Sequence, residues 1–358
     1  MKGFFDAAER TWMEQKGEGW WLRYWKNPWQ AALWSDSTLR EMQAHLDEAT
    51  AQANMAEDSP PNDALSRTRF ADRIHQTADL FQLTRTFIKF QKLSWTLQAK
   101  EWEQASSEEL LVGLEIAEEA IETRARLVET SAEVRGRHPN SASAHDLSWV
   151  FRYDSIGGSL GAIALRIAEL NLNSGTTLEM AGALVEKWNS ALGYSGLPTF
   201  EIGHQKLSDV GLAASGDRRV WRRQHLSSAG MEMDSDPKGS GFFAKNVRRG
   251  HIYQAFTAKG GHFYLGRLKL KSRQSPSGEV YIRLDFFDES GKLLVKSTRG
   301  RLAPVAEFGE FHNIRTLIKA PDSAAFGRLM IRFYEMDQGS RADLIHAEVQ
   351  DLGPAQSP

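Results

Sequence analysis

The chain has 358 residues, of which 41% are hydrophobic and 25% are charged, a composition typical of a folded globular protein with two or three domains. It contains no cysteine, which excludes disulfide bonds, thiolate metal sites and cysteine nucleophiles. The net charge of -2 is unevenly distributed, because residues 1–239 carry 26 basic and 34 acidic side chains whereas residues 240–350 carry 18 and 11. The basic last third is either a solvated surface or a surface for an anionic ligand.

No run of about 18 apolar residues occurs, so we expect no membrane-spanning helix. The start, MKGFFDAAER, has neither the basic region nor the apolar stretch of a secretory signal. We therefore expect that the chain either remains in the cytoplasm or begins within a longer protein, and we favour the second.

The first segment is unusually rich in tryptophan. Its members cannot all face one way, although Trp21, Trp25 and Trp29 are spaced by one helical turn each. We expect them to pack within a helical domain or against a neighbouring domain, and a sugar-stacking platform is the alternative. The set comprises Trp12, Trp20, Trp21, Trp25, Trp29 and Trp34.

Residues 36–135 show helical periodicity. A first helix after SDST has one apolar stripe, a second runs to about Lys100, and a third starts at Ser106, where Ser106 and Glu109 have the spacing of a capping box. Short connections predict an antiparallel bundle. The expected buried positions are Leu39, Met42, Leu46, Ala49 and Ala53 in the first helix, Phe70, Ile74, Phe81, Ile88 and Trp95 in the second, and Leu110, Leu114, Ala117, Ile121 and Val128 in the third.

Two further helices are predicted in GAIALRIAELN and TTLEMAGALVEKWNSALG. The small residues of the preceding IGGSLG resemble neither a complete nucleophile elbow nor a phosphate loop, and we expect them to permit close packing. Gly, Ser, Asp and Pro then dominate to about Gly241, which is typical of loops.

The last third alternates apolar and polar residues with period two in short stretches separated by turns such as SPSG and DESG. The predicted fold class is therefore α+β and multidomain, with an N-terminal all-α helical bundle followed by an antiparallel, jelly-roll-like β-sandwich. The predicted boundaries are 1–200 for the bundle, 201–214 for a linker, 215–353 for the sandwich and 354–358 for a tail.

Motifs in this last third resemble the carbohydrate-binding β-sandwich modules attached to cellulases and xylanases. They are Tyr253–Gln254 before a glycine-led strand, Asp288 to Lys292, and the segment from Ala320 to Ala324, while VWRRQ looks like the first strand of such a module. The resemblance implies polysaccharide binding and an extracellular or periplasmic location. A structural calcium, common in such modules, is in doubt because the acidic pair of the last strand is reduced to Glu348.

Alternation predicts which side chains such a module presents to solvent. In VYIRLDFF and GRLMIRFYE, one face of each strand carries aliphatic residues, and the other carries tyrosines, arginines and an aspartate. Arg267, Lys269 and Lys271 are outward in GRLKLK, and they would join the same surface if the strands share a sheet. Tyrosine rings stack on sugars and guanidinium groups grip carboxylates or sulfates, so the surface suits an anionic glycan, although any sandwich has polar outward positions. The predicted ligand contacts are Tyr281, Arg283, Asp285, Arg328, Arg332 and Tyr334, with Trp221 as a further candidate.

The aromatic first segment and the helix RFADRIHQTADLFQLTRTF resemble the helical region that follows the barrel in a glycoside-hydrolase-like family of unassigned function. The resemblance covers about residues 1–130 and implies an upstream catalytic barrel domain as a partner. The catalytic acids of such an enzyme have no counterparts in this chain.

Other chemistry finds little support. The histidines lack zinc-site spacing, so no metal and no other cofactor is expected, and the basic RRVWRR and NVRRG have no nucleic-acid-binding motif beside them. Acid pairs such as Asp285 with Asp288, or Glu115 with Glu118 and Glu119, are more simply solvated.

The predicted function is the non-catalytic, polysaccharide-binding part of a carbohydrate-active protein. A glycoside hydrolase with a carboxylate pair, or a scaffold for a missing barrel, are the alternatives.

Overall fold

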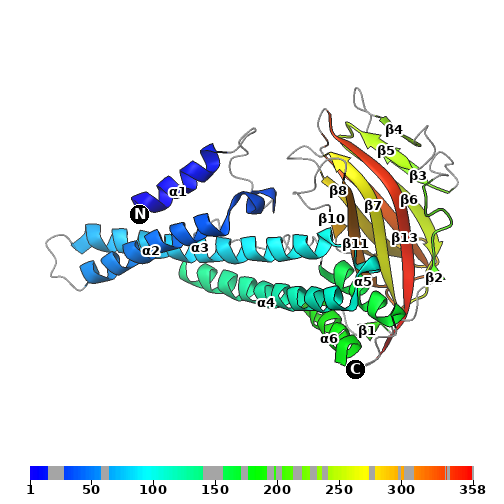
Figure 1. Ribbon diagram of the computed structural model, residues 1–358, viewed down its shortest axis with the longest axis horizontal. Coiled ribbons are helices and arrows are strands. Elements are labelled where there is room, and N and C mark those ends of the chain that lie inside the picture. The colour runs from blue at the N-terminus through cyan, green and yellow to red at the C-terminus, as the bar shows by residue number, and fades with distance from the viewer. Residues whose placement is uncertain are drawn as a thin grey trace. The chain divides into compact units, whose positions relative to one another are not determined.

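The computed structural model describes residues 1–14, 28–57, 64–139, 156–170, 176–191, 197–198, 204–212, 220–225, 232–235, 241–273, 279–296, 300–301, 310–334, 336 and 339–356. These residues belong to two compact units, the first formed by Met1–Lys92 with Glu122–Trp149 and the second by Leu93–Ile121 with Val150–Pro358. The predicted α+β class, with helices first and antiparallel sheets afterwards, is confirmed (Figure 1).

The first unit is helical. It contains α1 (Lys2–Met13), the 3-10 helix η1 (Pro28–Leu33), α2 (Asp36–Glu57) and parts of α3 (Ala64–Ala99) and α4 (Ser107–Arg137). The polar start of α2 is confirmed, because the Ser35 hydroxyl accepts a hydrogen bond from the Thr38 amide at 3.0 Å. The predicted stripe of α2 is buried in full, at Leu39, Met42, Leu46, Ala49 and Ala53.

The long helix α3 ends where predicted, and α4 runs back along it. At the end of α4, Arg137 and His138 bind the two carboxylate oxygens of Asp79 on α3 at 2.8 and 2.9 Å. The predicted seam of α3 is buried at Phe81, Ile88 and Trp95, but Phe70 is 67% exposed. The seven-residue spacing therefore extends beyond the packed part of the helix.

The capping box at the start of α4 is confirmed. The Ser106 amide donates to Glu109 Oε2 at 2.8 Å, and the Glu109 amide donates to the Ser106 hydroxyl at 3.3 Å, so two amides at the helix start are satisfied. Of the predicted face, Val128 is 43% exposed and the others are buried, namely Leu110, Leu114, Ala117 and Ile121.

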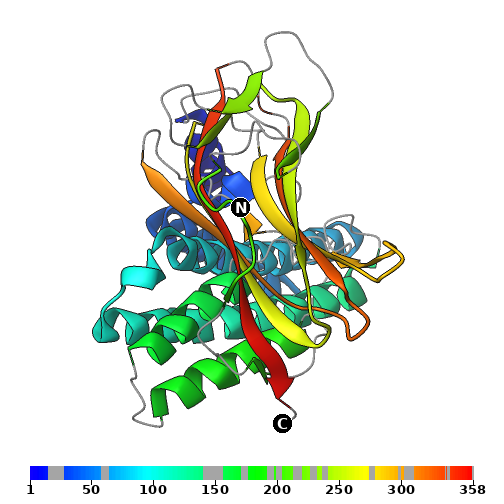
Figure 2. The same cartoon turned by 90° about the vertical axis from the view of Figure 1, so that its right-hand side faces the viewer.

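The second unit contains two antiparallel sheets. The first sheet has the order β11-β7-β13-β5-β4, and β1 and β2 also pair with β13; the second sheet has the order β10-β8-β12-β6-β3, and β9 also pairs with β8. The last strand, β13, runs along the whole first sheet (Figure 2). The strand bounds are β1 Leu197–Pro198, β2 His204–Gln205, β3 Arg222–His225, β4 Glu232–Ser235, β5 Phe242–Lys245, β6 Arg249–Thr257, β7 His262–Arg273, β8 Glu279–Phe287, β9 Leu293–Lys296, β10 Gly300–Arg301, β11 Phe311–Lys319, β12 Phe326–Tyr334 and β13 Arg341–Gln356.

Alternate residues of both sheets form one core, as period-two sequences require. From β8 the core takes the predicted residues Val280, Ile282, Leu284 and Phe286, and from β12 it takes Leu329, Ile331 and Phe333. The opposite face of each strand therefore points away from the core. The residues that alternate with these core positions are therefore the outward residues of both sheets.

Helices cover part of the outward face of the first sheet. The second unit also holds the 3-10 helix η2 (Trp102–Gln104), α5 (Ile156–Glu169) and α6 (Thr176–Ala191), and α5 packs on β11 and β7. A Cβ at Gly158 would lie 2.5 Å from the Arg315 backbone, and one at Gly161 would touch Leu265 and Leu317 at 3.4 Å. The prediction that IGGSLG permits close packing is confirmed, and its partner is a sheet.

The domain boundaries differ in detail from the prediction. Residues 93–121 and the helices α5 and α6 belong to the same compact unit as the sandwich. Leu207 and Leu212, within the predicted linker 201–214, are part of the sandwich core. The predicted tail 354–358 overlaps the end of β13, which pairs with β1.

Candidate functional site

The outward face of the second sheet gathers most of the predicted ligand contacts. We call it the cationic–aromatic face, and it comprises the outward residues of the three adjacent strands β6, β12 and β8. Since β12 pairs with both neighbours, its side chains lie in the middle of the face. The outward residues at its centre are His251 and Tyr253 on β6, Arg328, Met330, Arg332 and Tyr334 on β12, and Tyr281, Arg283 and Asp285 on β8.

Strand register brings these residues into rows across the sheet. Arg328 stands opposite Asp285, and Arg332 stands between His251 and Tyr281. Side chains directly opposite each other on neighbouring strands are close enough to interact. The register therefore confirms that the six predicted residues of β8 and β12 share one face.

The β8 side of the face is buried and internally paired. Arg283 and Asp285 form a two-pronged ion pair, with Nε to Oδ1 at 2.6 Å and Nη2 to Oδ2 at 2.9 Å. The exposed fractions are 8% for Arg283, 2% for Asp285 and 3% for Tyr281. The expectation that these three side chains are presented to solvent is therefore corrected, and the charges of Arg283 and Asp285 neutralise each other.

The β12 and β6 side is half-buried and keeps two arginines next to aromatic rings. The Arg328 guanidinium lies 4.3 Å from the centre of the Tyr253 ring and 4.6 Å from that of Phe287. The Arg332 guanidinium lies 5.7 Å from the centre of the Tyr281 ring. Within the described part of the chain, no carboxylate forms an ion pair with either arginine, so these contacts orient the two charges without cancelling them.

Three arginines surround His251 on this face and affect its pKa. Burial lowers the pKa of His251 below its ordinary value, and the charges of Arg332, Arg283 and Arg328 lower it further, while Asp285 acts in the opposite direction. The imidazole is therefore neutral at neutral pH. An anion placed against the face would oppose the effect of the arginines.

Trp221 does not belong to this face. It is fully buried in the sandwich core, and its indole Nε1 donates to the Asp209 carboxylate at 3.1 Å. The expectation that Trp221 contacts a ligand is corrected accordingly. The residue stands immediately before β3 and closes the core there.

The cations of β7 do not belong to this face either. Arg267, Lys269 and Lys271 are outward as predicted, but β7 lies in the first sheet whereas β8 and β12 lie in the second. Lys269 binds Glu101 at 2.7 Å, and Arg267 binds Glu103 at 2.7 Å. The condition that these strands share one sheet is therefore not met, and the cations of β7 do not join the face.

A buried ion network joins η2 to the first sheet. Arg315 on β11 is 1% exposed and binds both oxygens of Glu103, at 2.9 and 2.8 Å, and also the Lys100 carbonyl at 3.0 Å. Burial alone would raise the pKa of Glu103, but the hydrogen bonds and charges of Arg315 and Arg267 outweigh it and lower the pKa to about 2. This carboxylate is a structural anion rather than a proton donor at neutral pH.

Sequence reasoning missed His251 and Tyr253 as members of the cationic–aromatic face. Tyr253 was considered only as part of a motif, although the alternation in HIYQAF places 251 and 253 on one side of β6. Gln254, the other half of that motif, is 2% exposed and accepts the Ser208 amide at 2.7 Å, so its role is structural. Alternation along β6, as along β8 and β12, predicts that both residues point outward.

The acids considered for catalysis are structural or exposed. Asp288 accepts hydrogen bonds from the Ser290 hydroxyl and the Lys292 amide within its turn, and these bonds lower its pKa. Glu115, Glu118 and Glu119 are exposed on α4. Neither set forms a buried acid pair.

The donor set at Glu348 does not fit calcium. Its two oxygens bind cationic or imidazole partners, Arg267 at 2.5 Å and His346 at 2.9 Å. Calcium requires six to eight oxygen ligands. Across the described residues, no group of three or more side chains of histidine, aspartate or glutamate could hold a metal ion.

Some expectations fall on other parts of the chain. Trp20, Trp21 and Trp25 lie outside the described residues, as do the side chains of Trp12 and Trp29. Trp34 is half-buried and lines a pocket between helices. Among the helices that the structure describes, none combines the length and apolarity needed to cross a membrane.

No family model and no curated protein matches the chain. Solved structures are similar to part of it, among them the following three. The carbohydrate-binding module 22-1 and GH10 modules of Clostridium thermocellum xylanase 10B, complexed with xylohexaose, match at 14% identity over 42% of this chain and 28% of that one, with a TM-score of 0.29. TmCBM61 in complex with β-1,4-galactotriose matches at 12% identity over 41% and 97%, with a TM-score of 0.30. A Stig cyclase from Fischerella sp. TAU matches at 11% identity over 43% and 100%, with a TM-score of 0.31. At these identities and TM-scores the likeness carries no argument about function, and the chain spans little more than a quarter of the xylanase.

Proposed function

We propose that the cationic–aromatic face binds a polysaccharide that carries carboxylate or sulfate groups. The observation that carries the proposal is the pair Arg328 and Arg332, half-buried beside tyrosine rings and without a carboxylate partner among the described residues. A guanidinium group in this setting binds a planar carboxylate or a sulfate through two parallel hydrogen bonds. The neighbouring rings of Tyr253 and Tyr334 supply apolar area for the C–H faces of sugar rings.

The spacing of the two arginines favours a polymer over a small ion. They are four residues apart on one strand, which corresponds to about 13 Å at the usual rise of about 3.4 Å per residue. One carboxylate cannot reach both groups at that separation. A chain of sugar units lying along β12 can present successive anionic groups to them.

Replacing both arginines by alanine is expected to weaken binding by about tenfold or more, since each loses a charge-assisted hydrogen-bonding group. Affinity electrophoresis in gels that contain polygalacturonate, a sulfated glycan or neutral xylan measures the retardation. The matched control is Lys271→Ala with Lys319→Ala, which removes two cations from strands of the first sheet. Wild-type mobility that is unchanged in every gel would contradict the proposal, as would equal weakening by the control.

Binding of a sulfated glycan is expected to strengthen as the pH falls. The pKa of His251 in the free protein is lowered by burial and by three arginines, and a bound anion offsets the arginines and raises it. The bound state therefore takes up a proton, so affinity is highest below the free-state pKa and declines as the pH rises through the bound-state pKa. The pH range over which the affinity changes starts below about 6.5, which is the ordinary pKa of an imidazole.

Isothermal titration calorimetry over that range measures the effect, and a sulfated glycan is used because its own charge does not titrate there. His251→Asn serves as the control, for it keeps a polar side chain and cannot titrate. An affinity of the wild type that is as flat with pH as that of His251→Asn would refute the role of His251.

A further inference from the structure

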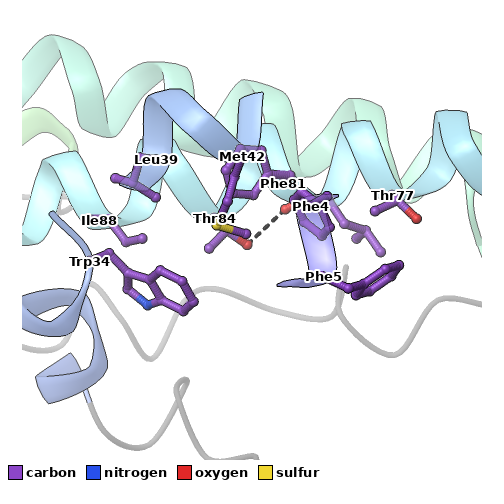
Figure 3. A pocket seen from close by; sticks show the side chains of 10 residues that line it. Phe4, Phe5, Trp34, Leu39, Met42, Thr77, Phe81, Thr84 and Ile88 are labelled. Atoms are coloured by element: carbon purple, nitrogen blue, oxygen red, sulfur yellow. Dashed lines mark hydrogen bonds between the residues drawn. The ribbon is translucent and has the colours of Figure 1, made fainter. Parts of the chain in front are cut away.

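A pocket of about 290 Å³ lies among the helices of the first unit. Figure 3 shows its lining side chains, which come from α1, α2, α3 and the residue after η1. Its volume is just below about 300 Å³, where the range of small-molecule sites begins. The lining consists of Phe4, Phe5, Trp34, Leu39, Met42, Thr77, Leu80, Phe81, Thr84 and Ile88.

The lining carries no charged side chain. Its two hydroxyl groups, of Thr77 and Thr84, both donate to carbonyls of their own helix, at Arg73 (2.8 Å) and Leu80 (2.9 Å), and its other polar group is the indole N–H of Trp34. A charged group placed here would lose its hydration without gaining a partner of opposite charge, which costs several kcal/mol or more. The pocket therefore selects against ions and against strongly polar molecules.

Packing beneath and beside the pocket keeps its walls in place. Met42, Phe81 and Ile88 are buried at 3%, 6% and 2% exposure. Phe4 meets Phe81 edge-to-face at 5.2 Å between ring centres, and Arg10 of α1 binds both carboxylate oxygens of Glu41 at 2.7 Å. These contacts hold α1 against α2 and α3 and oppose collapse of the space between them.

The mouth of the pocket is also apolar. Phe5 is 56% exposed there, and Trp34 is half-buried. Exposed apolar surface that continues into an apolar pocket is a feature of ligand-binding grooves. Figure 3 shows that the Phe5 ring and the Trp34 ring lie on the same side of the helices as the pocket.

We propose that this pocket binds an uncharged apolar small molecule, with an aromatic ring system or a short aliphatic chain that occupies the space between Met42, Phe81 and Ile88. The site is independent of the cationic–aromatic face in its ligand chemistry. An apolar pocket lined by aliphatic and aromatic side chains gains its affinity from removing apolar surface from water.

The test uses the full chain and N-phenyl-1-naphthylamine, an uncharged apolar dye that becomes fluorescent in an apolar site. The wild type is expected to bind it saturably. Thr84→Trp is expected to weaken binding by about tenfold or more, because the indole fills the pocket. Thr77→Trp fills it from a position about two turns earlier on α3 and is measured in parallel, so a folding defect of one variant does not decide the result.

The matched control is Gln82→Trp, which adds the same ring on an exposed position of α3. Dye binding equal to that of the wild type is expected for this control and for Arg328→Ala with Arg332→Ala. Far-UV circular dichroism confirms that each variant is helical. The proposal is overturned if the wild type does not bind the dye saturably, or if a folded Thr84→Trp or Thr77→Trp binds it as well as Gln82→Trp does.

Discussion

Replacing Glu103 by alanine is expected to lower the free energy of unfolding of the second unit by about 3–5 kcal/mol. Glu103 binds both Arg315 and Arg267, and Arg315 is 1% exposed. Removal of the carboxylate leaves the Arg315 charge buried without its partner, and this is the costly step. Urea unfolding followed by tryptophan fluorescence measures the change.

The pH dependence distinguishes this ion pair from a packing effect. The pKa of Glu103 is lowered from 4.5 to about 2, so its contribution to stability is present above about pH 4.5 and is lost as the pH falls toward 2. The difference in unfolding free energy between the wild type and Glu103→Ala is therefore expected to shrink across that interval. Combining Glu103→Leu with Arg315→Met should restore part of the loss, because the Arg315 charge is then no longer buried without its partner, while Arg267 keeps Glu348. A difference that stays constant with pH would mean that the pair contributes by shape alone.

Replacing Gly158 by alanine is expected to destabilise the second unit by about 3 kcal/mol, at the upper end of overpacking effects. The added Cβ would lie 2.5 Å from the Arg315 carbonyl carbon and 2.7 Å from the Thr316 nitrogen, and both atoms belong to a strand within a sheet. Neither can move without disturbing hydrogen bonds of the first sheet. Either α5 must lift from the sheet or β11 must shift.

Gly182 of α6 provides the control for this prediction. It is also a helical glycine, but a Cβ there would meet nothing within 4 Å. Gly182→Ala is expected to stabilise by about 0.5–1 kcal/mol, because alanine is the better helix former. Thermal unfolding of the two variants beside the wild type tests the contrast. A loss of stability in both variants would mean that the expected gain from helix propensity is wrong, and it would not contradict the contact of α5 with the sheet.

The sequence predicted elements and faces well because these depend on near neighbours. The capping box at Ser106 and the alternation in β8 and β12 need only residues within one turn or one strand, and both are confirmed. The small residues around Gly158 signalled close packing for the same reason. A side chain's face follows from local geometry alone.

The sheet that a strand joins, and the residues that pack over its outward side, could not be predicted from local sequence. Alternation predicts that Lys269 points outward, but it does not predict which sheet its strand joins, and β7 joins a different sheet from β8. Alternation also does not predict which segments pack on the outward side of a strand. Nothing in GRLKLK therefore indicated that Glu101 and Glu103 bind the cations of this strand. The prediction for Trp221 was wrong because a tryptophan next to arginines has the same local sequence whether it closes a core or lies on a binding surface.

The position of β13 has a consequence for how the sandwich forms during synthesis. This strand pairs with β1, β2, β5 and β7, so it holds the middle of the first sheet although it is made after every other strand that the structure describes. Until residues 341–356 leave the ribosome, β7 and β5 have no partner between them, and their edges stay open to pairing with another chain. Nascent chains that stall before Arg341 should therefore depend on chaperones far more than those released after Gln356.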